Sequence, residues 1–429
     1  MLFFVDQVTE RLQFTLEFVF RQHGIHFELT NDLSIFEAET GFKCSYSDYP
    51  FQSVKTILPS DLLFEDHIRD NPRLEIGTWN GVDCLSIDGK TDPIAAIFFL
   101  ISRYEEYLPG VRDKHDRFSS KNSFLHKFGW LEKPIAEYWI EALYNFLDPE
   151  RKQLCPEKKV TVIPSFDIDN TFAFKWKDGW RFLLSELKDR FKGNNQRREL
   201  RKNVRSGMCK DPFDTFEEIE RCAGLFPETR VFWLLADWGE FDRNITWKDP
   251  RHQRLIRTIS RMAKVGLHPG YASNLSDKRL SEEKQRIELI IGEPVRESRQ
   301  HFLKVRLPQT YNRLINEGFR RDFSMGFADA PGFRLGTARP VYFFDLGHNC
   351  QTDFQLMPFV YMDGTFNEYL GCSVEEAKAN VLSLYKEVQQ FGGVFCFIWH
   401  NETIGESGKW KGWSELYRST LELVSSRHD

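Results

Sequence analysis

The sequence predicts an α/β protein in two parts, a smaller α+β unit followed by a larger unit in which strands and helices alternate. The first observation is length, since 429 residues exceed what one ordinary core accommodates. The second is a polar, proline-containing stretch, RKQLCPEKK, at residues 151–159, which is typical of a linker. The third is an alternation of apolar strand-like and helical stretches from residue 159 onward, which indicates a parallel sheet or barrel with helices outside. We therefore expect domains at residues 1–155 and 156–429.

The first unit is expected to combine short strands with three helices. A helix at residues 9–24 would begin at Thr9, which favours an N-cap, and end at Gly24, which favours a C-cap. Two more helices are expected at residues 92–108 and 134–147, and strand-like pieces at residues 25–30, 42–49 and 83–88. The charges of the second helix, Arg103, Glu105 and Glu106, fit a solvated face with local pairing. We therefore expect residues 1–155 to carry no part of the chemistry.

The second unit repeats strand and helix. Strand-like stretches are expected at residues 160–169, 229–237, 265–273, 344–348 and 392–401, and helices at residues 252–266, 281–292, 306–319 and 373–391. Residues 188–210 carry nine Lys or Arg against two acidic residues. That stretch fits a solvated helical excursion, or else a surface that meets an acidic or lipid-phosphate substrate.

Composition excludes several classes of protein. A net charge of −5 argues against bulk binding of nucleic acid, which needs a basic face. The eight cysteines are scattered and form no C-x-x-C pair, so neither a zinc ribbon nor a thioredoxin-like motif is indicated. The longest apolar runs, such as residues 95–101, are too short to span a bilayer. The first residues lack the basic and apolar regions of a secretory signal, so we expect a cytoplasmic protein. The pattern leaves the oligomeric state open.

Two carboxylates stand at the end of the first strand of the second unit. In VTVIPSFDID, Asp167 and Asp169 are two residues apart and so point to the same side. Two adjacent carboxylates repel each other, and a metal ion or a raised pKa usually relieves that repulsion. Active sites of α/β proteins lie at the C-terminal ends of parallel strands, which favours a functional pair. A helix cap or surface turn is the alternative.

Two histidines also follow strand-like stretches. His268 comes after KVGL, with Pro269 and Gly270 forming the turn behind it, and His400 ends the apolar run VFCFIW. Several polar side chains at strand ends that meet at one barrel mouth indicate a site, and His268 is then a credible metal ligand. Alternatively, each histidine is structural and bonds a nearby carbonyl.

Arg299 and His301 are again two residues apart, in PVRESRQHFLKV. If this stretch is a strand, both side chains share one face. An arginine beside carboxylates stabilises their charged form and fixes their geometry. A surface Arg-x-His is the alternative.

These residues follow the order of motifs in the NodB-homology polysaccharide deacetylases, carbohydrate esterase family 4, which residues 159–405 resemble. PSFDID resembles the first motif, VGLHPG the second, IGEPVRESRQH with the trailing LINEGFRRDFS the third, and VFCFIWH the last. The stretch AAIFFLISRYEEYLPGVRDKHDRF resembles a domain of unassigned role that accompanies such deacetylases in Bacteroidetes-type bacteria. The resemblance implies a distorted (β/α) barrel of the NodB-homology type behind a smaller α+β domain.

The sequence departs from the family at its ligands. The usual adjacent Asp-Asp is Asp167-Ile168-Asp169, and the usual Arg-x-Pro is Arg299-Gln300-His301. The usual second histidine of the second motif, four residues after His268, is Ala272, which cannot bind metal. Metal sites of this kind usually have three protein ligands, so we expect His301 to complete the site. The alternatives are that His301 binds substrate, or that the site binds metal weakly or not at all.

The resemblance implies a metal-dependent hydrolase that removes acetyl groups, N-acetyl before O-acetyl, from a sugar or polysaccharide precursor. A divalent metal, Zn²⁺ first, would be held by Asp169, His268 and His301, while Asp167 acts as general base and His400 as general acid. Arg299 would hold Asp167 ionised, and the roles of the two aspartates could be reversed. One alternative is a non-catalytic carbohydrate-binding protein on a degenerate barrel, and another is a different metal-dependent hydrolase such as a phosphoesterase.

Overall fold

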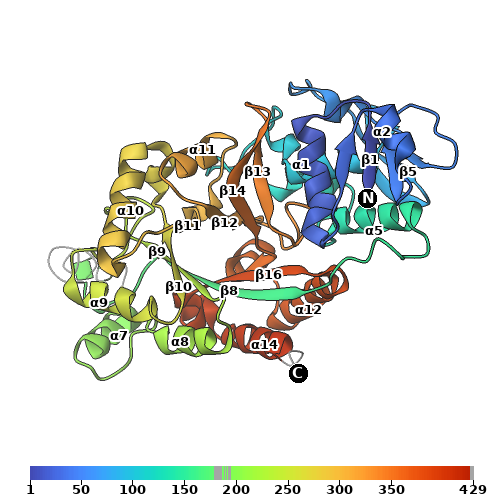
Figure 1. The fold of residues 1–429 in the computed structure, drawn as a ribbon. Helices are drawn as coiled ribbons and strands as arrows, with labels where there is room; N and C mark the ends of the chain where they lie inside the picture. The colour runs from blue at the N-terminus through green and yellow to red at the C-terminus, as the bar shows by residue number, and fades with distance from the viewer. Residues whose placement is uncertain (178–185, 188, 190, 192–194, 426–429) are drawn as a thin grey trace.

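A computed structural model of the chain describes residues 1–177, 186–187, 189, 191 and 195–425. Within these residues the strands form a four-stranded, a three-stranded and a nine-stranded sheet. Figure 1 shows the two small sheets in the N-terminal unit and the large sheet, with most of the later helices around it, in the rest of the chain. The predicted fold class, an α/β barrel of distorted form behind a smaller α+β unit, is confirmed.

The N-terminal unit is built on a parallel sheet of order β2-β1-β3-β4 and an antiparallel one of order β5-β6-β7. Its strands are β1 (Leu2–Val5), β2 (Glu28–Thr30), β3 (Lys43–Tyr46), β4 (Lys55–Ile57), β5 (Leu74–Trp79), β6 (Val82–Ile87) and β7 (Lys90–Thr91). Its helices are α1 (Glu10–Val19), α2 (Leu33–Ala38), α3 (Pro93–Ile101), α4 (Phe124–Lys127) and α5 (Ile135–Leu147). Thr9 caps α1 as predicted, but Gly24 ends a separate 3-10 turn, Arg21–His23.

The large sheet runs β13-β14-β12-β11-β10-β9-β8-β16-β15. Its strands are β8 (Val160–Ile168), β9 (Arg230–Leu234), β10 (Lys264–His268), β11 (Glu297–Ser298), β12 (Arg321–Met325), β13 (Val341–Asp345), β14 (Cys350–Pro358), β15 (Tyr361–Met362) and β16 (Gly393–His400). Between these strands lie helices α7 (Asn195–Arg205), α8 (Phe216–Leu225), α9 (Pro250–Ile259), α10 (Asp277–Ile291), α11 (Gln309–Asn316) and α12 (Val374–Phe391), and after β16 come α13 (Asn401–Ile404) and α14 (Ser414–Ser425).

One bent segment closes this sheet into a barrel. β14 pairs in parallel with β12, and two residues later the same stretch continues as β15, which pairs in parallel with β16 at the opposite edge. The two ends of the parallel part of the sheet, β14 and β15, are therefore joined through residues 350–362. β13 pairs with β14 in the antiparallel sense and stays outside this parallel ring.

Side-chain alternation divides the barrel into an apolar interior, a polar mouth and an outer layer. Ile163 on β8 and Cys396 on β16 pack in the interior with Phe232 and Phe323. Farther along the same face, where Asp167 is in register with His400, the side chains are polar. The alternate residues Phe166 and Trp399 belong to the outer core, beneath the helices. The strand ends thus present their polar groups at one mouth.

The two units share one continuous hydrophobic core. Phe14 of α1 contacts Phe344 of β13 with ring centroids 5.0 Å apart, which matches the position of α1 beside β13 in Figure 1. Two buried polar contacts cross the same interface: Glu106 and Arg334 form an ion pair at 2.6 Å, and the Arg103 guanidinium donates a hydrogen bond to the Arg334 carbonyl.

The prediction that Arg103, Glu105 and Glu106 form a solvated face of the second helix is therefore wrong. α3 ends at Ile101, Arg103 has a left-handed backbone conformation, and Arg103, Glu105 and Glu106 are all buried. Burial is tolerated because each charge has a partner: Arg103 bonds both glutamates, at 2.8 Å each. These residues join the two units.

The basic stretch 188–210 is described only in part, since residues 188, 190 and 192–194 lie outside the described residues. Its described portion includes α7, whose surface is mostly exposed. Arg201 of this helix is buried and pairs with Glu186 at 2.9 Å and with Asp189. No described helix is both long and apolar enough to cross a membrane.

Candidate active site

The end of β8 supplies the two aspartates, and the barrel interior fixes the first of them. Asp167 is buried, and its Oδ1 lies 2.8 Å from Nη1 of Arg299. Arg299 follows β11 and crosses the interior, where its Nε donates to the Phe323 carbonyl at 3.0 Å and its guanidinium lies 4.5 Å from the Phe232 ring centroid. The predicted pairing of Arg299 with Asp167 is thus present, and the guanidinium balances the negative charge of this first aspartate.

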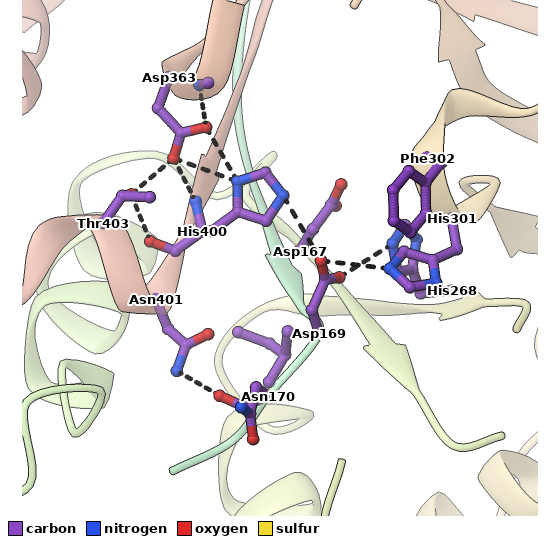
Figure 2. A network of polar contacts seen from close by, with 12 residues as sticks. Asp167, Asp169, Asn170, His268, His301, Phe302, Asp363, His400, Asn401 and Thr403 are labelled. Carbon is purple, nitrogen blue, oxygen red and sulfur yellow. Dashed lines mark hydrogen bonds and ion pairs between the residues drawn. The ribbon is translucent and has the colours of Figure 1, made fainter. Parts of the chain in front are cut away.

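Asp169, His268 and His301 come together beside this ion pair. Oδ1 of Asp169 lies 3.1 Å from Nε2 of His268, and Oδ2 lies 3.4 Å from Nε2 of His301. One ligand atom from each residue falls within 4.8 Å of the other two. Figure 2 shows both imidazoles directed at the Asp169 carboxylate. The three side chains predicted as metal ligands therefore face a common point, and Asp167 stands outside the group.

His301 reaches this point by a route that differs from the predicted strand. β11 ends at Ser298, and His301 begins a short 3-10 turn, His301–Leu303, in which Phe302 has φ of 59°. The i, i+2 spacing therefore does not place Arg299 and His301 on one strand face: Arg299 enters the barrel interior, whereas a turn directs His301 to the mouth. The backbone of Phe302 is unusual, because residues other than glycine rarely adopt positive φ.

The outer nitrogen of each imidazole is held by the protein. Nδ1 of His268 lies 2.6 Å from the Arg299 carbonyl oxygen, and Nδ1 of His301 lies 2.9 Å from Oδ1 of Asp242. Metal-binding histidines are usually oriented in this way, by a carbonyl or carboxylate on the nitrogen that does not bind the ion. Nε2 of each ring is thereby turned towards Asp169.

The electrostatics of this group favour a cation. Burial alone would raise the pKa of Asp169, but His301 and His268 outweigh it, so that pKa lies well below its usual range. Burial would likewise lower the pKa of His301, but Asp169 and Asp242 raise it to about 9. Asp169 and Asp242 therefore favour a positive charge between them. When no metal ion is bound, a proton on His301 supplies that charge.

The donor set also fits a divalent ion on independent grounds. Oδ1 of Asp169 is buried and accepts no aligned hydrogen bond, because the nearby His268 nitrogen meets the distance of an ion pair without the geometry of a hydrogen bond. A buried carboxylate oxygen without an aligned donor is rare in proteins. One carboxylate and two imidazoles are a usual three-ligand set for zinc that leaves a position for water.

His400 forms the opposite side of the mouth with a partner, Asp363, that was not predicted from the sequence. Its Nδ1 lies 2.9 Å from Oδ1 of Asp363, whose Oδ2 accepts a hydrogen bond from the His400 backbone N–H at 2.8 Å (Figure 2). Burial disfavours the imidazolium, but Asp363, followed by Asp169 and Asp167, raises the pKa of His400 well above its usual value. The raised pKa favours the protonated imidazole that a general acid requires.

These groups line a pocket of about 200 Å³. Its walls include Asp167, Asp169, His268, His301, Phe302, Asp363, Tyr369, His400, Glu402, Trp410 and, from the N-terminal unit, Arg117. Burial and then the charge of Asp169 raise the pKa of Glu402 to about 7. The pocket thus combines acids and imidazoles with the aromatic side chains of Phe302, Tyr369 and Trp410, which suit the faces of a sugar ring.

Asp242, Asp363, Glu402 and Arg117 are residues of the site that were not predicted from the sequence. Asp363 could have been found by the criterion used for the other residues, since it follows the strand-like FVYM. Asp242 lies in the loop GEFDRN and Arg117 in the first unit, and neither position carries a periodic signal. Only the fold shows that these two residues reach the mouth.

Comparison with known proteins matches residues 1–151 to DUF7033, a family of unknown function. No curated protein matches the chain in sequence. Similar solved structures include a protein from Mycobacterium smegmatis described as a polysaccharide deacetylase, which is 14% identical over 64% of this chain and 87% of that chain, with a TM-score of 0.41. PuuE allantoinase is 10% identical, covering 65% and 90% of the two chains, with a TM-score of 0.36. The polysaccharide deacetylase Bc1974 from Bacillus cereus is 10% identical, covering 63% and 89%, with a TM-score of 0.28.

Proposed function

We propose that this protein is a metal-dependent hydrolase that removes acetyl groups, N-acetyl in preference to O-acetyl, from a sugar or polysaccharide precursor. The observation that carries the proposal is the convergence of Asp169, His268 and His301 on one point, with Asp167 and His400 beside it at the same mouth. The motif order supports an acetylated sugar as substrate, because it resembles that of polysaccharide deacetylases.

Asp169, His268 and His301 are the residues that would hold the ion, and Zn²⁺ suits this set. When bound there, the ion would supply a water with a lowered pKa and would polarise the acetyl carbonyl. Asp167 is the residue that would act as general base and accept a proton from a water at this position. Its pairing with Arg299 occupies Oδ1 and leaves Oδ2 for the proton.

His400 gives its proton to the leaving group. An amine is a poor leaving group unless it is protonated, so an imidazolium at this position suits an N-acetyl substrate better than an O-acetyl one. Asp363 holds Nδ1 of His400 and leaves Nε2 for the substrate. Nε2 of His400 lies 3.9 Å from Oδ2 of Asp169, so the proposed acid and the proposed ligand border the same part of the pocket.

Acetate release from N-acetylated and O-acetylated sugars tests the proposal, with the full chain stripped of metal and then reloaded with Zn²⁺. Release that requires the metal, and that is faster from the N-acetylated set, is expected. Sugar binding without acetate release, equal with and without metal, would instead support the carbohydrate-binding alternative. Release of phosphate from phosphate esters by the reloaded protein would support a phosphoesterase.

A further inference from the structure

The N-terminal unit reaches the pocket through the loop that follows its 3-10 turn Tyr104–Glu106. Arg117 on this loop is buried and lines the same pocket as Asp167, Asp169 and His400. The site is therefore not confined to the second unit, although residues 1–155 were expected to take no part in it.

Arg117 joins the two sides of the pocket. Its Nη1 donates to the Phe302 carbonyl at 3.0 Å, directly after the ligand His301, and its Nη2 donates to the Tyr369 hydroxyl at 3.1 Å on the side that carries Asp363. Its Nε pairs with Asp113 at 2.7 Å, which holds the guanidinium in place. A guanidinium presents its Nε and two Nη donors in a rigid plane, so it can bond all three of these partners at once. An ammonium has no such fixed arrangement of donors.

The turn that Arg117 holds has an unusual backbone. Phe302 and Leu303 have φ of 59° and 55°, and non-glycine residues keep such a conformation only where their surroundings hold it. The loop of the N-terminal unit also covers the Phe302 side chain, since the His115 ring lies 4.6 Å from it, centroid to centroid. The direction of His301 depends on this turn.

We propose that Arg117 is a positioning residue of the active site, so that the N-terminal unit completes the site by holding the turn that directs His301 to the metal position. The role rests on the proposed metal-dependent function. It gives the N-terminal unit a function at the barrel mouth in addition to its buried contacts with the barrel.

Cobalt(II) binding to the full chain tests this role, because the ion reports its ligand geometry through its visible absorption spectrum. The variants are Arg117→Gln and Arg117→Lys, with Arg306→Gln as the matched control. Arg306 is half-exposed and pairs with Asp116 at 3.3 Å, so it ties the same loop to the barrel away from the pocket. The unfolding temperature of each metal-free variant shows whether the fold is kept.

Arg117→Gln is expected to weaken Co²⁺ binding about 10-fold and to change the spectrum. This is the low end of the loss seen when a partner bonded to a metal ligand is removed, because Arg117 acts on His301 through the Phe302 carbonyl. Arg117→Lys is expected to fall between this variant and the native protein, while Arg306→Gln stays native. If Arg117→Gln does not fold, a native affinity in Arg117→Lys would refute the role, and a weakened one would support it. Native affinity and spectrum in a folded Arg117→Gln would overturn the proposal. Failure of the native protein itself to bind Co²⁺ would refute the proposed function as well.

Discussion

Replacement of Asp242 by asparagine probes the orientation of His301 without touching any proposed ligand. Asp242 is buried, and its Oδ1 lies 2.9 Å from Nδ1 of His301, while both its oxygens accept from the Tyr271 N–H at 3.0 and 3.1 Å. Asparagine keeps the shape but removes the charge, and it brings an N–H donor that can face the imidazole. Nε2 of His301 then becomes a weaker and less well directed ligand.

The expected effect of Asp242→Asn is a loss of Zn²⁺ affinity. Removal of an outer carboxylate from a metal-binding histidine costs about 10- to 100-fold in affinity, which corresponds to about 1.4 to 2.7 kcal/mol. Competition with a chromophoric chelator measures the Zn²⁺ affinity. Asp237→Asn is the matched control, because Asp237 lies in the same connection but is exposed and pairs with Arg286. Equal affinities for Asp242→Asn, Asp237→Asn and the native protein would refute the assignment of His301 as a ligand held by Asp242.

Three further predictions follow from other groups. Asp167→Asn should keep the metal and lower kcat by about 100-fold or more, because a general base is lost; if the metal is lost instead, the roles of Asp167 and Asp169 are interchanged. Asp363→Asn should lower kcat and shift its alkaline limit to lower pH, because the carboxylate that raises the pKa of His400 is gone; an unchanged pH profile would argue against His400 as the acid. Burial raises the pKa of Glu283 from 4.5 to about 7, so the folded state keeps a proton that the unfolded state loses. The stability from this group is full below about pH 4.5 and falls by about 3 kcal/mol as pH rises to 7. Glu283→Gln should flatten that decline in urea unfolding of the metal-free protein, and an identical decline would disprove the shift.

The barrel was predictable because its strands are buried and apolar, as β8 and β16 show. The bent closure through residues 350–362 was not, because β14 carries the polar residues Gln351, Thr352 and Asp353 and resembles no buried strand. The length of α3 was overestimated for a related reason. The run from Pro93 continues with helix-forming residues to Leu108, but Arg103 leaves the helical conformation to reach its partners on the barrel.

The six predicted site residues all lie at the barrel mouth or in the interior beneath it. Asp167, Asp169, His268 and His400 stand at the ends of strands that the sequence marks clearly. Arg299 and His301 instead follow the two-residue strand β11, which the sequence pattern left open. Their partners could not be predicted in the same way. Asp242 and Arg117 lie on loops, where nothing in the local pattern shows what the side chain meets in three dimensions. The path of His301 through a left-handed turn was also hidden, since Phe302 and Leu303 are residues that usually favour extended or helical backbone.

Metal content tests the central claim most directly. Elemental analysis after reconstitution with Zn²⁺ and removal of excess ion should give about one ion per chain, as expected for a single three-ligand site. His301→Ala should lose most of that metal, whereas His348→Ala should not, because His348 is exposed and pairs with Asp345 away from the pocket. A native protein that retains no metal, or a His301→Ala variant that binds it as tightly as the native chain, would contradict the assignment of Asp169, His268 and His301 as a metal site.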